Sequence, residues 1–160
     1  MARLLIVHHT PSPGMQAMLE AVLEGARQAG EQGAAEGAAP AEVRLLPALG
    51  ATVPDVLAAD AYLLGTPANI GYMSGALKHF FDTVYYPVLS ATQGRGYGLY
   101  VHGNNDTAGA VRGVESIAAG LRWRRVRPAV SVVGEVDRAD LDACRDLGGL
   151  LALQAMQPGA

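Results

Sequence analysis

Cysteine is nearly absent from this chain of 160 residues, and the single thiol excludes several kinds of site. With Cys144 alone, no intramolecular disulfide can form. Zinc fingers, CxxC redox motifs and cysteine-ligated iron–sulfur clusters all require more than one cysteine. The lone cysteine also gives no support for secretion. We therefore expect neither a disulfide framework nor a metal site in this protein.

Charge of one sign and long apolar runs are lacking too. The chain has 12 basic and 15 acidic side chains, a formal net charge of -3 at pH 7, which gives no general field for nucleic acid. The longest uncharged stretch, residues 61–77, is interrupted by Gly65, Pro67 and Gly71, so it cannot form a membrane-spanning helix. The first apolar run ends at Val7, too early for a signal peptide. We expect a cytoplasmic protein without a membrane span and without a nucleic-acid partner.

Hydrophobic residues make up half of the chain, which is typical of a globular protein. A chain of this length can bury a sizeable core without metals or disulfides. We therefore expect one domain over residues 1–160. Residues 30–41 contain only Gly, Ala, Glu, Gln and Pro, with no large apolar side chain to bury, and predict an exposed loop within this domain.

Short apolar runs alternate with stripes of helical spacing along the whole chain. The runs predict strands at residues 4–7, 42–46, 61–64, 97–101 and 129–133. Four of the runs are followed by a stripe with apolar residues at steps of three and four, the last of them capped by Asp137. The second run is followed by Thr52 and Asp55, a pair that marks the start of a short helix, so the sequence predicts five helices. This alternation is typical of an α/β three-layer sandwich, in which helices cover both faces of a five-stranded parallel sheet. Ligands of such sheets bind at the carboxyl ends of the strands.

The turn after the first strand can hold a phosphate. It carries the hydroxyl groups of Thr10 and Ser12, and the N–H groups of Gly14 and Met15 lie where a helix begins. Neither a Walker loop nor a dinucleotide GxGxxG fingerprint is present. The alternative interpretation is a plain helix cap in a proline-rich turn.

The turn after the third strand, residues 65–72, is long and free of charge. Its backbone groups can bind a flat heterocycle, while Ile70 and Tyr72 cover the face of the ring. The alternative is an ordinary connection between a strand and a helix, although eight residues exceed the usual length.

The turn after the fourth strand, residues 102–107, brings His102 and Asn104 to the same edge of the sheet. His102 can donate to a reduced ring or to an oxygen of an electron acceptor. The alternative is a polar residue at the end of a strand whose hydrogen bonds are satisfied within the protein.

The segment Gly65-Thr66-Pro67, continued by Gly71-Tyr72-Met73-Ser74-Gly75-Ala76-Leu77-Lys78-His79-Phe80-Phe81-Asp82, resembles the flavodoxin-like family. The resemblance is strongest to its NAD(P)H-dependent FMN reductases and to quinone reductases of the tryptophan-repressor-binding-protein type. It implies a flavodoxin-like sandwich and an FMN cofactor. The implied phosphate contacts are Thr10, Ser12, Gly14 and Met15. The implied ring contacts are Pro67, Ala68, Asn69, Ile70, Gly71, Gly103 and Asn104, with His102 as the catalytic residue.

The resemblance also implies an enzymatic activity. The protein would be an oxidoreductase that passes a hydride from NADPH or NADH through FMN to a quinone or a similar small acceptor. The protein would then form a homodimer or homotetramer. Two alternatives stay open, an electron-carrier flavodoxin and a flavin-binding protein without turnover. Pro13 supplies no N–H and Met15 no hydroxyl where the family has glycine and threonine, which weakens the expected grip on phosphate.

Four arginines surround Trp123 in one short segment: Arg122, Arg124, Arg125 and Arg127. They can bind the 2′-phosphate of NADPH or a nucleic acid. The alternative is a solvated surface or a contact between subunits. The sequence does not distinguish NADH from NADPH as the donor.

Overall fold

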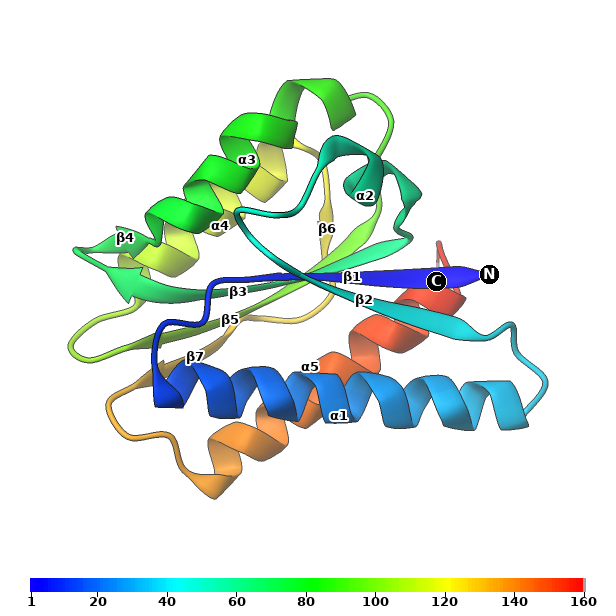
Figure 1. Cartoon of the computed structure of the whole chain (residues 1–160), viewed down its shortest axis with the longest axis horizontal. Helices are drawn as coiled ribbons and strands as arrows, with labels where there is room; N and C mark the ends of the chain where they lie inside the picture. The colour runs from blue at the N-terminus through cyan, green and yellow to red at the C-terminus, as the bar shows by residue number, and fades with distance from the viewer. Residues whose placement is uncertain (160) are drawn as a thin grey trace.

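A computed structural model describes residues 1–159 as three layers, with a mainly parallel sheet between two layers of helices (Figure 1). The strands are β1 (Ala2–His8), β2 (Ala41–Pro47), β3 (Ala61–Asn69), β4 (Tyr72–Met73), β5 (Gly96–Gly103), β6 (Arg124–Arg125) and β7 (Val130–Val133). The helices are α1 (Pro13–Ala35), α2 (Val53–Ala58), α3 (Gly75–Val88), α4 (Ala108–Gly120) and α5 (Arg138–Met156). The expected α/β sandwich with helices on both faces is confirmed.

The sheet has the strand order β2-β1-β3-β5-β6, with β4 beside β3 and β7 beside β5. The main path has five strands, as the sequence predicts. The expected total of five is wrong, however, because the sheet also contains β4 and β7 and so has seven strands. The fifth position is broken in two: β6 pairs with Gly96–Tyr97, and β7 pairs with Tyr100–Gly103. The other addition, β4, pairs with β3 in the antiparallel direction.

The central strands are buried on both faces, which explains why their apolar runs do not alternate with polar residues. In β1, Leu5 and Val7 belong to the core under α2, α3 and α4, whereas Leu4 and Ile6 belong to the core above α1 and α5. All four side chains are fully buried. β1 therefore joins the two cores at the centre of the molecule.

The core under α3 and α4 is built around Trp123. Its ring stacks on Tyr62 with the centroids 4.1 Å apart, and its Nε1 donates a hydrogen bond to Thr92 Oγ1 at 2.8 Å. The next two residues, Arg124 and Arg125, form β6 and are exposed. The tryptophan of the arginine-rich segment is thus a core residue that anchors the edge of the sheet.

The other face is covered by α1 and α5, whose backbones touch through glycines. A Cβ added to Gly25 would lie 2.0 Å from the Arg145 carbonyl oxygen, and one added to Gly148 would lie 2.0 Å from the Val22 carbonyl oxygen. No Cβ fits at such distances. Because glycine has no side chain, the two helices pack more closely than they could with any other residue at these two positions.

The expected loop over residues 30–41 is wrong in extent. α1 continues to Ala35 and β2 begins at Ala41, so only residues 36–40 connect them. The prediction rested on the absence of large apolar side chains, but small ones let the helix end approach its neighbours. A Cβ on Gly33 would lie 2.9 Å from Met156 Sδ of α5. The end of α1 is thus packed on the side of Gly30 and Gly33, while residues 31, 32 and 34–40 are exposed as expected.

Two further properties concern the helices. Cys144 is fully buried on the inner side of α5, and burial, with a smaller effect of the Asp140 charge, raises the pKa of its thiol to about 12. The thiol therefore stays protonated at neutral pH. Within residues 1–159, no helix combines the length and the apolar character that crossing a bilayer requires.

Candidate functional site

Three connections lie at one edge of the sheet, where β1, β3 and β5 end (Figure 1). The strand order reverses at β1, since β2 lies on one side of it and β3 on the other. Ligands of open α/β sheets bind outside the carboxyl ends of the strands at such a switch point. The three segments that the sequence predicts therefore share the edge at which a ligand is expected.

Hydroxyl groups and helix N–H groups dominate the first turn. Ser12 caps α1, since its Oγ accepts a hydrogen bond from the Met15 N–H at 3.3 Å. Gly14 lies in the first turn of α1, where an N–H group has no acceptor within the helix. Thr10 Oγ1 lies 2.6 Å from His8 Nδ1. This turn can therefore bind an anion with neutral donors, without a lysine or an arginine.

His8 can direct the hydroxyl of Thr10. Burial of the ring, and to a smaller extent the charge of His9, lower the pKa of His8 from its usual 6.5, so the imidazole is neutral at pH 7. When its single hydrogen lies on Nδ1, the ring donates it to Thr10 Oγ1. The hydroxyl hydrogen of Thr10 is then free to point toward an anion. His8 and Thr10 thus form a donor chain that ends at the ligand side of the turn.

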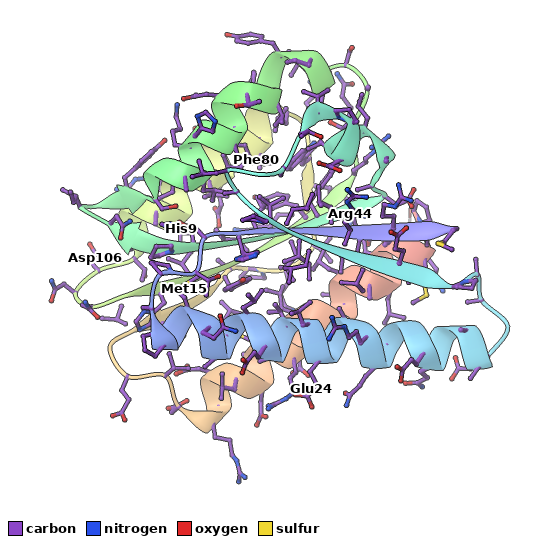
Figure 2. All side chains as sticks on the ribbon, in the orientation of Figure 1. His9, Met15, Glu24, Arg44, Phe80 and Asp106 are labelled. Atoms are coloured by element: carbon purple, nitrogen blue, oxygen red, sulfur yellow. The ribbon has the colours of Figure 1, made fainter. Side chains whose placement is uncertain are left out.

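His9 adds an unsatisfied donor or acceptor at the end of β1 (Figure 2). Its backbone N–H donates to the Gly65 carbonyl oxygen at 3.0 Å, which fixes the residue against β3. Its ring Nδ1 is buried and has no hydrogen-bond partner within residues 1–159. Buried polar atoms are rarely unpaired in proteins. A ligand bound at this edge could supply the partner that His9 Nδ1 lacks.

The second segment is a tight hairpin and not the long loop that the sequence predicts. β3 continues to Asn69, and its last two residues pair with Tyr72 and Met73 of β4. Only Ile70 and Gly71 form the turn, and both have a positive φ, of 49° and 75°. Two such residues define the type I′ turn that suits a hairpin. The backbone of residues 65–69 is therefore largely committed to the sheet.

Ile70 is strained and fully exposed at the tip of this hairpin. A β-branched residue at a positive φ is uncommon, and this one has a relative exposure of 105%. Tyr72 beside it is also exposed. Strained backbone positions cluster at functional sites, where the surrounding structure enforces them. The hairpin thus offers two apolar side chains to a flat ligand.

The hairpin is held rigidly by α4. A Cβ added to Gly109 would lie 1.9 Å from the Gly71 carbonyl oxygen, and one added to Gly113 would lie 2.5 Å from the Tyr72 ring. At its base, the buried Thr66 hydroxyl donates to the Pro67 carbonyl oxygen at 2.8 Å and accepts from the Ser74 N–H at 3.0 Å. Packing and hydrogen bonds therefore fix the tip in its strained conformation.

His102 lies within β5, not in the turn after it, because β5 extends to Gly103. Its Nε2 lies 2.6 Å from the Gly134 carbonyl oxygen. A carbonyl oxygen only accepts, so Nε2 carries the hydrogen and donates it. A Cβ added to Gly14 would lie 3.2 Å from His102 Cε1. The ring is thus wedged between the start of α1 and the end of β7, and its catalytic role stays a prediction.

The three segments are in contact with one another. Gly14 and His102 join the first to the third. A Cβ added to Gly103 would lie 3.1 Å from Ala68 Cβ, which joins the hairpin to the end of β5. The hydroxyl of Thr107, the residue just before α4, pairs with the hydroxyl of Ser131 in β7. Of the predicted site residues, Asn69 and Asn104 are exposed at the rim.

The donor set fits a phosphate and a flat apolar ring, the two ends of FMN. Neutral O–H and N–H groups lie in the first turn, an arrangement that suits a phosphate at a helix N-terminus. Gly14 and Gly103 lack the Cβ that would project between the segments. Ile70 and Tyr72 supply exposed apolar surface for a ring.

No protein-family model matches the chain, and no curated protein matches it. Solved structures do. A WrbA-like flavodoxin from Agrobacterium tumefaciens is 23% identical with a TM-score of 0.76, over 98% of this chain and 99% of that one. A flavodoxin from Streptococcus pneumoniae TIGR4 is 17% identical with a TM-score of 0.76, over 96% and 99%. The rubredoxin oxygen:oxidoreductase of Desulfovibrio gigas is 12% identical with a TM-score of 0.75, over 96% of this chain and 36% of that one.

The chain has the flavodoxin-like fold, which these structures share. The resemblance carried by residues 65–82 is confirmed in this respect. Sequence reasoning gave no role to His8 or Gly134, and it placed His9 in the first turn without assigning it a role. The signal for the two histidines was their position at the end of the first strand, directly before the turn. Nothing in the sequence indicates Gly134, because its contact with His102 depends on how β7 lies beside β5.

Proposed function

We propose that this protein is an FMN-binding, cytoplasmic oxidoreductase that passes electrons from NAD(P)H to a quinone or a similar small acceptor. The observation that carries the proposal is the convergence of two features at the switch point of the sheet, an uncharged anion-binding turn and a strained, exposed apolar hairpin. A flavodoxin and a WrbA-like flavodoxin among the structural neighbours support the choice of FMN.

The first turn would hold the phosphate of FMN. Thr10 and Ser12 supply hydroxyl groups, and Gly14 and Met15 supply N–H groups at the start of α1. The Met15 N–H is already bound to Ser12 Oγ, and Pro13 has no N–H. Fewer donors are left than a complete turn would offer, so we expect FMN to exchange with the solvent and not to stay permanently bound.

The hairpin and the end of β5 would hold the ring. On the hairpin side, the proposed contacts are Pro67, Ala68, Asn69, Ile70 and Gly71. On the other side, they are His102, Gly103 and Asn104. Since His102 Nε2 donates to Gly134, the atom left for proton exchange with a ligand is Nδ1.

FMN, when bound, accepts two electrons from NAD(P)H as a hydride and gives two electrons to a quinone, which takes up two protons to become a hydroquinone. The protein's part is to orient both substrates at one exposed face and to keep the ring edge out of water. We propose that donor and acceptor use this face in turn. We also propose that copies of the chain form a homodimer or homotetramer, for which the exposed Tyr86 offers apolar surface.

An electron-carrier flavodoxin is the second candidate, because a flavodoxin matches the chain with the same TM-score as the WrbA-like protein. Protein electron carriers use charge to steer their partners. Asp106 is the one acidic residue in residues 9–15, 66–72 and 102–107, which favours the enzyme.

Binding and turnover test the proposal separately. In the binding test, FMN fluorescence is followed as the purified protein is added, with riboflavin as the matched ligand that lacks the phosphate. We expect quenching of both, with FMN bound about tenfold or more tightly, as a charged hydrogen-bonded group warrants. No quenching of either ligand would overturn the FMN site.

Turnover is measured with added FMN, NADPH or NADH, and a benzoquinone. We expect His102→Asn to lower kcat about tenfold or more, as loss of a proton-transferring group does. His79→Asn, an exposed histidine on α3, is the control and should leave kcat unchanged. No turnover with any pair of substrates, together with a long-lived one-electron reduced state, would favour the electron carrier.

A further inference from the structure

A second hollow lies beside the three turns, between α4 and the broken edge of the sheet. Its volume is about 690 Å³, within the usual range of small-molecule sites. Val111 and Pro128 supply apolar walls, and Arg112, Glu115 and Arg125 supply charge. We call this hollow the α4 groove. It shares none of the residues predicted to bind FMN.

The break in the edge strand creates the groove. β6 ends at Arg125 and β7 begins at Val130, so residues 126–129 leave the sheet between them. Val126 keeps one hydrogen bond, from its N–H to the Tyr97 carbonyl oxygen at 3.0 Å. Pro128 has no N–H to pair with β5. Pro128 and Ala129 of this connection line the groove.

The groove carries a cation without a partner. Arg125 Nη1 lies 3.2 Å from Glu115 Oε1, which holds that guanidinium against α4. The side chain of Arg112, one turn before Glu115, has no hydrogen-bond or ion-pair partner within residues 1–159. With two arginines and one glutamate, the lining has a surplus of one positive charge. The structure also divides the arginine-rich segment, because Arg127 lines a different hollow, beside α1 and α5.

The groove adjoins the proposed flavin site on two sides. Thr107 lines one end of it and directly follows the turn at residues 102–106. Arg112 also lines a neighbouring hollow of about 340 Å³ with Gly71 and Tyr72 of the hairpin. From Thr107 to Ser116 the groove follows α4 for nine residues, about 13 Å at the helical rise. A long ligand can therefore reach from the hairpin along α4.

We propose that the α4 groove binds the adenosine half of NADPH, with Arg112 on its 2′-phosphate. This inference rests on the proposed function, in which NAD(P)H is the donor. Val111, Pro128 and Ala129 would cover the purine, and the guanidinium would bind phosphate oxygens in its planar, two-pronged geometry. NADH has a neutral hydroxyl where NADPH has this phosphate, and leaves Arg112 unpaired. The groove therefore selects NADPH over NADH.

Binding of adenosine 2′,5′-bisphosphate and of adenosine 5′-monophosphate, measured by calorimetry, tests the groove without flavin or turnover. We expect the wild type to bind the bisphosphate about tenfold or more tightly than the monophosphate. Arg112→Gln should abolish this difference. Arg27→Gln, an exposed arginine on α1 on the other side of the sheet, is the matched control and should keep it. Equal affinities in the wild type, or an unchanged difference in Arg112→Gln, overturn the inference.

Kinetics separate this inference from the proposed function. In Arg112→Gln, the KM for NADPH should rise about tenfold, while kcat and the KM for NADH stay unchanged. Turnover that depends equally on NADPH and NADH in both proteins overturns the groove and leaves the oxidoreductase standing. Arg112-dependent bisphosphate binding without any turnover supports the groove and overturns the oxidoreductase.

Discussion

The face of the sheet covered by α1 and α5 and the edge where β1, β3 and β5 end are packed in opposite ways. Between α1 and α5, Gly25 and Gly148 bring backbone against backbone. The carboxyl edge instead holds a strained Ile70 and a buried His9 nitrogen without a partner. The first region is closed by direct backbone contact, although the core beneath it also holds a buried Tyr100 hydroxyl without a partner within residues 1–159, whereas the second presents an exposed apolar side chain at its rim. The tight contact between the two helices and the proposed ligand site thus lie in different regions of the fold.

The largest effect on stability is expected from a side chain that forces α1 and α5 apart. In Gly148→Ala, the new Cβ would meet the Val22 carbonyl oxygen at 2.0 Å, and the helices must move apart. We expect a loss of about 3 kcal/mol or more in the free energy of unfolding, the upper range for overpacking. Urea denaturation measures it. Gly149→Ala is the control, because its nearest neighbour lies at 3.5 Å. Equal losses in both variants would contradict this account of the packing.

Thr10→Val tests the carboxyl edge. The variant keeps the shape of the side chain and removes the hydroxyl that His8 orients. We expect FMN affinity to fall about tenfold or more, because a hydrogen bond to a charged group is lost, while riboflavin affinity stays unchanged. Fluorescence titration measures both.

The matched control for Thr10→Val is Thr83→Val, on the exposed side of α3. The Thr83 hydroxyl makes one local hydrogen bond, to the His79 carbonyl oxygen at 2.9 Å, away from the three turns. It should leave FMN affinity unchanged. If the two variants weaken FMN binding alike, the first turn does not bind the phosphate.

Ile70→Gly should make the protein more stable while it weakens binding of the flavin ring. Glycine adopts a positive φ without strain, so we expect a gain of about 1 kcal/mol and a rise in Tm of about 2–4 °C. Loss of the exposed apolar side chain should weaken ring binding. Arg122→Gly, at the other non-glycine position with a positive φ (59°) within residues 1–159, is the control. It should gain stability without loss of flavin affinity, and equal flavin affinity in both variants would remove Ile70 from the site.

Apolar runs sufficed to place the main elements, because a strand buried on both faces needs an uninterrupted run such as Leu4–Val7. The predicted start signals, Thr52 with Asp55 and Asp137, lie where α2 and α5 begin, and the structure adds Asp140 as the partner of Asp137. The end of α1 was missed, because contacts made by small residues such as Gly33 leave no periodic signal. Tertiary contacts, which no local pattern reports, decide such boundaries.

The site was predictable as a set of segments and not as a geometry. Thr10 and Ser12 lie in the turn that their residue types indicate. The hairpin at Ile70 was read as a loop, since its turn signal was a lone Gly71 after a β-branched residue. α4 enforces this turn through Gly109, some forty residues away in the sequence. Long-range packing of this kind determines where the backbone is free to bind a ligand.

The smallest effect concerns pH and the His8 ring. Folding lowers the pKa of His8, so between the native pKa and the unfolded value of 6.5 the unfolded chain binds more protons than the native one. Stability is therefore fully present above pH 6.5 and is lost as the pH falls through the native pKa of His8. Urea denaturation between pH 7.5 and pH 5 should show this loss in the wild type and a smaller one in His8→Asn. His79→Asn, which removes an exposed histidine, should keep the slope of the wild type, and a slope that both variants reduce equally would show that His8 is not the group responsible.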